Sequence, residues 1–204
     1  MILSDREIEL ALDQGTLVIS PRPDPKHMDS TTVDLRLGPT LDQWDFPRPD
    51  EGLGQQPLRF RPAHPGFKFH ELEKRYTKQI DIKEKGFELE PTPGRNFILG
   101  WTIERIYLPH KSRLCARVEG KSSMARMGLG VHVTAPTIHA GFGYNANDPN
   151  DQGASLRLEI WNVGPLPIEL SYGMRICQLI LEEVREVPKA GYLGQFNLQG
   201  PKPA

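Results

Sequence analysis

The chain has 204 residues, 25% of them charged and 38% hydrophobic, which is the composition of one globular domain with a substantial core. Its 25 basic and 26 acidic residues leave a net charge of −1, so nothing indicates a protein that holds duplex DNA or RNA by phosphate neutralisation. The acidic start MILSDREIEL lacks the apolar run of a signal peptide, and no segment approaches membrane-spanning length. We therefore expect a cytoplasmic protein with neither a nucleic-acid nor a membrane partner.

The first predicted element is a short helix. Ser4 and Glu7 form a capping-box pattern, in which each side chain satisfies a free backbone N–H of the first turn. Gly15 follows the last apolar residue of the helical pattern, which predicts a helix from Asp5 to about Gln14. The next segment, LVIS, is a strand candidate and precedes a proline-rich loop.

The middle of the chain is irregular apart from one strand. Over positions 33–37, apolar residues alternate with Asp34 and Arg36, which predicts a strand with one solvent-exposed face. Residues 39–95 are rich in proline and show little periodicity. We predict short strands and long loops there, with one helical turn near His70–Arg75.

From Phe97 onward, β-branched and aromatic residues form dense runs separated by Gly, Pro and Asn at the spacing of a sandwich or barrel. The runs are FILGWTIERIYL, RLCARVE, SLRLEIWN, PIEL and RICQLILEEV. The two cysteines, Cys115 and Cys177, lie inside such runs, so we expect reduced core residues rather than a disulfide. The sequence predicts one mainly antiparallel β domain over residues 1–204, with minor helix.

A cluster of hydroxyls and cations follows the run RLCARVE through Gly120. Glycine there permits a sharp turn, and backbone N–H groups beside hydroxyls and cations make a cradle for an anion. The GKS triplet is not a P-loop, because that motif needs a further glycine where this chain has Cys115. The cluster consists of Lys121, Ser122, Ser123 and Arg126.

A lone carboxylate stands on the predicted strand SLRLEIWN. Strand alternation places one set of side chains on each face, Leu156, Leu158 and Ile160 on the first and Arg157, Glu159 and Trp161 on the second. Apolar segments flank the strand, so we expect the second face to be partly enclosed. A glutamate in such a site suits general acid–base work.

These segments, in this order, resemble the dCTP deaminases of the trimeric dUTPase-like superfamily. The resemblance runs through LSDREI, STTVDLRLG, GRNFILGWTIERIYLP, RVEGKSSMARMGL and YGMRICQL. It implies a distorted β-barrel or jelly roll, assembled as a homotrimer with each active site at a subunit boundary. It also implies hydrolysis of dCTP to dUTP and ammonia without zinc. The chain itself has neither the H-x-E pair nor the P-C-x-x-C pair of zinc deaminases.

The resemblance assigns roles to individual residues. Ser122 corresponds to the serine that holds the attacking water, Arg126 to the arginine that orients the catalytic carboxylate, and Glu159 to the glutamate that shuttles protons. The backbone carbonyl of Ala135 corresponds to a contact for the water and the exocyclic amine. The remaining substrate contacts that it implies are Lys121, Ser123, His139, Phe142, Gln178, Tyr192 and Gln199, with Mg²⁺ bound through the triphosphate.

The chain departs from the family pattern in three places. His139 stands where an aspartate usually contacts the sugar, and the loop Tyr144–Ala154 is longer than the usual hairpin. In the tail, Gln195 and Phe196 replace a common Lys-Tyr pair. We hypothesise that Arg157 supplies the lost phosphate cation.

Several alternatives stay open. The protein could also cleave dUTP to dUMP, act on a modified or different pyrimidine nucleotide, or bind nucleotide as a regulator without turnover. The missing aspartate at position 139 argues against the first, and the intact trio of catalytic residues argues against the last. Residues 185–204 are predicted to be a mobile tail that closes over the nucleotide. Inhibition by dTTP is left undecided.

Overall fold

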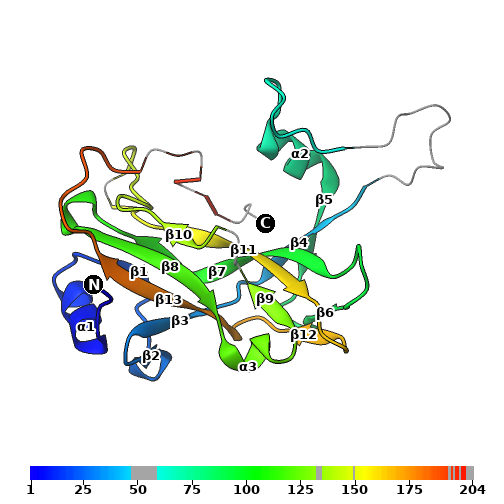
Figure 1. Ribbon diagram of the computed structural model, residues 1–204, viewed down its shortest axis with the longest axis horizontal. Coiled ribbons are helices and arrows are strands. Elements are labelled where there is room, and N and C mark those ends of the chain that lie inside the picture. The colour runs from blue at the N-terminus through cyan, green and yellow to red at the C-terminus, as the bar shows by residue number, and fades with distance from the viewer. Residues whose placement is uncertain are drawn as a thin grey trace.

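The computed structural model describes residues 1–46, 59–131, 135–148, 150–192, 194, 196–197 and 199–200. Within them the fold is mainly β, with few helices (Figure 1). The helices are α1 (Asp5–Asp13), α2 (Phe69–Tyr76) and α3 (Ser122–Ala125), with 3₁₀ turns at Pro25–His27 and His110–Ser112. The strands are β1 (Val18–Ser20), β2 (Met28–Asp29), β3 (Thr32–Arg36), β4 (Thr40–Trp44), β5 (Thr77–Asp81), β6 (Phe87–Leu89), β7 (Phe97–Tyr107), β8 (Leu114–Gly120), β9 (Leu129–Val131), β10 (Thr137–Ile138), β11 (Ala154–Asn162), β12 (Ile168–Leu170) and β13 (Arg175–Glu183).

Two antiparallel sheets dominate the described part of the chain. One has the strand order β5-β4-β7-β11-β9, with β1 also pairing with β7. The other has the order β10-β8-β13-β3-β2, and a separate ribbon pairs β12 with β6. Every pairing is antiparallel, as predicted from the alternating runs separated by turn residues.

Both sheets contribute side chains to one hydrophobic core. Ile98 of β7 and Leu158 of β11 come from the first sheet, Leu35 of β3 and Leu179 of β13 from the second, and each is fully buried. Burial of such side chains stabilises the fold by about 1.5–3 kcal/mol each. The core holds β11 in place along its whole length, so a side chain on its other face has a fixed position.

The predicted N-terminal helix is confirmed as α1, including its capping box. The backbone N–H of Ser4 donates to Glu7 Oε2 at 2.7 Å, and the Ser4 hydroxyl accepts from the backbone N–H of Glu7 at 3.5 Å. Ile8 and Ala11 are the buried residues of the helix. It ends at Asp13, and Gly15 takes the left-handed conformation with φ +66°.

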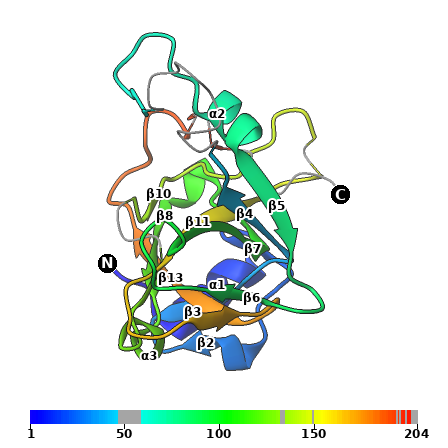
Figure 2. The ribbon, with the colours of Figure 1, turned by 90° about the vertical axis from the view of Figure 1, so that its right-hand side faces the viewer.

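Helix α2 stands apart from the sheets, beyond the ends of β4 and β5 (Figure 1). It is longer than the single turn predicted near His70–Arg75, and it buries none of its residues. Figure 2 places α2 and α3 at opposite ends of the molecule, as Figure 1 does. Among the described residues, no helix combines the length and apolar character needed to cross a membrane.

Candidate active site

Glu159 lies on β11 with its side chain on the face turned away from the core. Its Cα partner on β7 is Leu99, and the partner of Leu99 on the next strand, β4, is Asp42. Directly opposed residues of antiparallel strands share a face, so these three side chains form a row across the sheet. Two strand spacings separate the backbones of Glu159 and Asp42, about 10 Å. Glu159 is partly buried, as expected for an enclosed face.

A cavity of about 300 Å³ opens above this row. Its walls are mostly aromatic and aliphatic, with few charged groups, which is the usual character of a small-molecule site. Seven of the predicted site residues meet here, so sequence positions far apart are brought together as expected. They are Ala135, His139, Phe142, Arg157, Glu159, Tyr192 and Gln199. The other lining residues are Phe69, Leu99, Thr137, Ile138, Leu156 and Phe196.

The alternation predicted for β11 holds for the core side chains, but the strand pairing is interrupted at one point. The pairing of β11 with β7 shifts register between Ser155 and Arg157, which is the mark of a β-bulge. The backbone N–H of Leu156 instead donates to the Thr102 hydroxyl at 2.9 Å. Leu156 belongs to the hydrophobic core with Leu158 and Ile160, as predicted, and it also borders the cavity.

Arg157 is buried between two carboxylates. Its Nη1 donates to Asp42 Oδ2 at 2.6 Å and its Nη2 to Glu73 Oε1 at 2.7 Å. The guanidinium carbon lies 4.4 Å from the centre of the Trp101 ring, a cation–π distance. The hypothesis that Arg157 replaces the missing phosphate cation is therefore wrong, because its charge is already compensated inside the protein.

His139, which stands where the family has an aspartate, forms part of an aromatic wall. Its ring stacks on Tyr192 with centroids 5.1 Å apart and an interplanar angle of 24°. The Phe142 ring lies 6.4 Å from that of Tyr192, and the backbone N–H of Tyr192 donates to the Ala140 carbonyl at 3.0 Å. The substitution thus gives the cavity a ring where a carboxylate would stand.

The C-terminal segment lies over the cavity of its own chain. Asn197 accepts a hydrogen bond from the Gly143 N–H at 2.9 Å and donates to the Tyr144 carbonyl at 3.0 Å. The Phe196 ring meets Phe69 edge-on at 6.0 Å. Gln195, which with Phe196 replaces the Lys-Tyr pair of the family pattern, lies outside the described residues. The predicted role of residues 185–204 as a mobile tail over the nucleotide stays a prediction.

The long loop predicted over residues 144–154 borders a different cavity of about 510 Å³. Asn145 and Gln152 hydrogen-bond to each other within the loop, and Arg105 pairs with Asp151 at 2.6 Å. Gln199 lines both cavities, so the two cavities adjoin each other at this residue. The loop borders the larger cavity and does not line the one that contains Glu159.

The hydroxyl and cation cluster lies elsewhere on the chain, at the end of the molecule opposite α2 (Figure 2). Ser122, Ser123 and Arg126 are exposed, and they do not line the cavity above Glu159. Gly120 ends β8 without a positive φ, so the turn does not use the conformational freedom of glycine. One chain therefore carries the two predicted halves of the site in separate places.

Asp34 organises this second region, which the sequence analysis missed. It is buried rather than solvent-exposed, and it pairs with Lys121 and with Arg175, the latter at 3.1 Å. Gln178 donates to the Thr32 hydroxyl at 3.1 Å and to Asp34 at 3.4 Å. The prediction of a solvent-exposed face is therefore wrong at Asp34, because cations from β13 and the β8 terminus cover it.

Cys177 lies beneath this cluster and is fully buried, whereas Cys115 is partly buried. Both thiols are free, but the prediction of core residues is right only for Cys177, because Cys115 lies outside the core cluster. Burial raises the pKa of the Cys177 thiol strongly, with further contributions from the nearby Glu104 and Asp34 carboxylates. Burial also raises the pKa of Cys115. Neither thiol is set up as a nucleophile, because each holds its proton.

The mainly antiparallel β fold thus carries an acid-bearing cavity and, in a separate place, a cluster of hydroxyls and cations. The chain belongs to the dCTP deaminase-like family, whose model matches residues 2–184. A protein of Methanosphaera stadtmanae named dCTP deaminase, dUMP-forming, is 35% identical over 192 residues, 94% of this chain and 83% of the relative. One of Natronomonas pharaonis named dCTP deaminase is 36% identical over 195 residues, 94% and 85% respectively.

A solved structure supports the fold. The crystal structure of 2'-deoxycytidine 5'-triphosphate deaminase from Agrobacterium tumefaciens superposes with a TM-score of 0.61 at 22% identity. The likeness covers 89% of this chain and about half, 48%, of the Agrobacterium chain. The predicted mainly β fold is confirmed, and it is similar to the fold of that deaminase.

Proposed function

We propose that this protein hydrolyses dCTP to dUTP and ammonia, with Glu159 as the acid–base group. One observation carries the proposal: Glu159 stands on the floor of a cavity whose walls are mostly aromatic and aliphatic. Such walls suit the faces of a pyrimidine ring. Relatives at 35–36% identity are named dCTP deaminase, one of them with the addition dUMP-forming.

The reaction forms a bond from a water oxygen to C4 of cytosine and breaks the bond from C4 to the exocyclic nitrogen. Glu159 accepts a proton from the attacking water and delivers it to ring nitrogen N3. The second proton of the water leaves with the amine as ammonia, and Glu159 returns to its starting state. A carboxylate in this role contributes about 10²–10⁴-fold to the rate.

We infer that a second copy of the chain completes each site, in a homotrimer. Ser122 and Arg126 would hold the water and orient Glu159, but on one chain they are exposed and do not line its cavity. A cyclic arrangement in which the 122–126 turn of one copy meets β11 of the next satisfies every site in the same way.

The cavity suits the nucleoside and not the triphosphate. Of its charged lining residues, Glu159 is an acid and Arg157 is compensated by Asp42 and Glu73. A triphosphate carries several negative charges and needs cations or N–H donors. We therefore assign it to the cluster of Lys121, Ser123 and Gln178, extended by Arg175, because there two cations share the single carboxylate of Asp34 and an excess positive charge remains.

Mg²⁺ would accompany the triphosphate. Among the described residues, no group of three His, Cys, Asp or Glu side chains is placed to hold a metal ion, and Asp34 is occupied by two cations. With few protein ligands, the ion would be bound mainly by phosphate oxygens and water, as is common for Mg²⁺. Lys121 and Ser123 would then hold the phosphates that carry it.

Further hydrolysis of dUTP to dUMP is the second candidate, because several relatives are named dUMP-forming. Against it, position 139 carries an imidazole stacked on Tyr192 instead of a carboxylate that could hold a second water. We therefore favour an enzyme that stops at dUTP. The free thiols Cys115 and Cys177 suit the reducing cytoplasm, which we propose as its compartment.

One assay separates these activities. The protein is incubated with dCTP and Mg²⁺, with and without dTTP, and ammonia, dUTP, dUMP and pyrophosphate are resolved. We expect ammonia and dUTP in equal amounts, whereas dUMP with pyrophosphate would support the second candidate. Binding of dCTP without ammonia would contradict an enzyme and point to a regulator or to a different substrate. A lower rate with dTTP would identify it as an inhibitor.

A further inference from the structure

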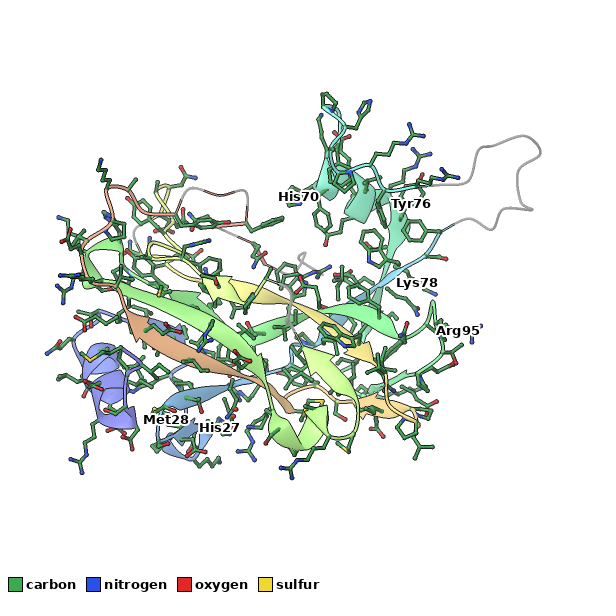
Figure 3. All side chains as sticks on the ribbon, viewed as in Figure 1. His27, Met28, His70, Tyr76, Lys78 and Arg95 are labelled. Carbon is green, nitrogen blue, oxygen red and sulfur yellow. The ribbon has the colours of Figure 1, made fainter. Side chains whose placement is uncertain are left out.

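The position of α2 depends on a small number of contacts outside the core. The helix buries none of its residues, and its backbone stands apart from the two sheets in Figure 3, where His70 and Tyr76 are labelled. Even so, Phe69 at its first position lines the cavity above Glu159. A helix outside the sheets thus supplies one wall of the site.

An ion triad ties this wall to the cavity floor. Glu73 of α2 and Asp42 of β4 share the guanidinium of Arg157, whose side chain is only 10% exposed. Arg157 precedes Glu159 by two residues on the same face of β11. The strand that carries the proposed acid–base group therefore also carries the anchor of the wall.

Aromatic contacts at Phe69 complete the wall. Its ring meets Trp44 edge-on at 6.4 Å and Phe196 edge-on at 6.0 Å, and the latter ring also lies 5.8 Å from His70. Phe196 lines the cavity too. The tail and α2 therefore present two rings to the space that we assign to the nucleoside.

We propose that Phe69 is a specificity-determining residue that contacts the nucleoside, and that Arg157 and Glu73 are positioning residues that hold it there. The inference deepens the proposed function and depends on it for the substrate. An aromatic edge beside the pyrimidine discriminates by the size of ring substituents, because a rigid wall excludes added volume. The wall holds its position only while the ion triad is intact.

The test compares Phe69→Ala, Phe69→Leu and Glu73→Gln with the wild-type protein. The matched control is Glu71→Gln, since Glu71 lies on the same helix in an exposed pair with Lys68. We expect Phe69→Ala and Glu73→Gln to raise KM for dCTP roughly tenfold, with kcat changed little. They should also improve kcat/KM for 5-methyl-dCTP relative to dCTP. Glu71→Gln should match wild type in both.

A double variant distinguishes positioning from general damage. If Glu73 acts through Phe69, the two substitutions combined raise KM no more than either does alone. Additive effects, or an unchanged preference for 5-methyl-dCTP, would overturn the proposal. Phe69→Leu retains an apolar side chain. Its melting temperature, compared with that of Phe69→Ala, shows whether weaker dCTP binding by Phe69→Ala comes from unfolding.

Binding of dCTP with Mg²⁺ is measured by calorimetry on the same proteins. Weaker binding by the single variant Phe69→Ala, with wild-type affinity in Glu71→Gln, supports the wall even if the wild-type protein releases no ammonia. Failure of the wild-type protein to release ammonia would contradict only the proposed reaction. Wild-type turnover with unchanged binding and KM in Phe69→Ala and Glu73→Gln would contradict only the wall.

Discussion

At the scale of single residues, the two carboxylates of the row across the sheet, Asp42 and Glu159, have different surroundings. Asp42 is buried and paired with the Arg157 guanidinium, so it balances a charge and holds α2 indirectly. Glu159, two strands away on the same face, lines the cavity itself. This separation of roles assigns the proton shuttle to Glu159 and the structural charge to Asp42.

Glu159→Gln should therefore abolish the chemistry and leave binding intact. Glutamine has nearly the same shape but cannot accept the proton of the attacking water, so we expect kcat to fall by about 10²–10⁴-fold. Steady-state ammonia release and calorimetric binding of dCTP are the measurements. Glu169→Gln, on the exposed side of β12, should behave as wild type. Deamination at the wild-type rate by Glu159→Gln would remove the proposed proton role.

Cys177 gives a prediction for stability at high pH. Its pKa is raised in the folded state above the ordinary value of 9.0, mainly by burial. Below pH 9 the thiol is protonated in both states, whereas above pH 9 only the unfolded chain ionises. The free energy of unfolding should then fall with rising pH by about 1.4 kcal/mol per unit from this group.

Urea unfolding of wild type and Cys177→Ala at pH 8 and pH 10 tests this prediction. The contributions of all other titrating groups to the pH dependence are the same in both proteins, so the difference between them reports on Cys177. The drop between the two pH values should be smaller in Cys177→Ala than in wild type, although the variant is less stable at pH 8. Equal drops would mean that the buried thiol does not contribute.

At the scale of elements, close backbone approaches hold the tail over the cavity. Gly141 has φ +91°, and a Cβ there would lie 2.6 Å from the backbone nitrogen of Tyr192. Both the left-handed conformation and the contact require glycine. The tail is thus docked by main-chain fit as well as by the stack of Tyr192 on His139.

Gly141→Ala should displace the tail and raise KM for dCTP. The matched control is Gly15→Ala at the end of α1, which has φ +66° and no atom within 4 Å of the added Cβ. Both variants should lose about 1 kcal/mol of stability from backbone strain. KM should rise only in Gly141→Ala, and proteolysis of its tail should be faster. A normal KM in Gly141→Ala would separate tail docking from substrate binding.

The elements differ in how well the sequence predicts them. Helix α1 and the long strands follow from local patterns, a capping box and alternating apolar residues, which the core then reinforces. For helix α2 the local pattern predicted one turn near His70–Arg75 but not its full length or its contact with β11, since Glu73 meets Arg157 from 84 residues away. The bulge at Ser155/Arg157 is also hidden, because a register shift leaves no mark in the composition.

The candidate site follows the same division. The family resemblance supplied the predictions for single residues, and seven of the predicted residues meet in one cavity. Asp34 was misplaced because alternation alone does not reveal that Lys121 and Arg175 cover it. The pairing of Arg157 with Asp42 was hidden for a similar reason, since its partner lies 115 residues away.

At the scale of the whole molecule, the account depends on how copies of the chain meet. On one chain, the exposed residues Ser122 and Arg126 do not line the cavity with Glu159. A monomer would hold an acid without its orienting cation and a phosphate cluster without a nucleoside. The proposed trimer joins each cavity to the turn of a neighbour.

Mixing two inactive variants tests this claim most directly. Glu159→Gln and Arg126→Ala are each assembled alone and then co-assembled in equal amounts, and ammonia release from dCTP is measured. If each site takes Glu159 from one copy and Arg126 from the next, roughly a quarter of the sites in random mixed trimers are intact. The account predicts activity near that fraction of wild type. A mixture no more active than the separate variants would contradict it.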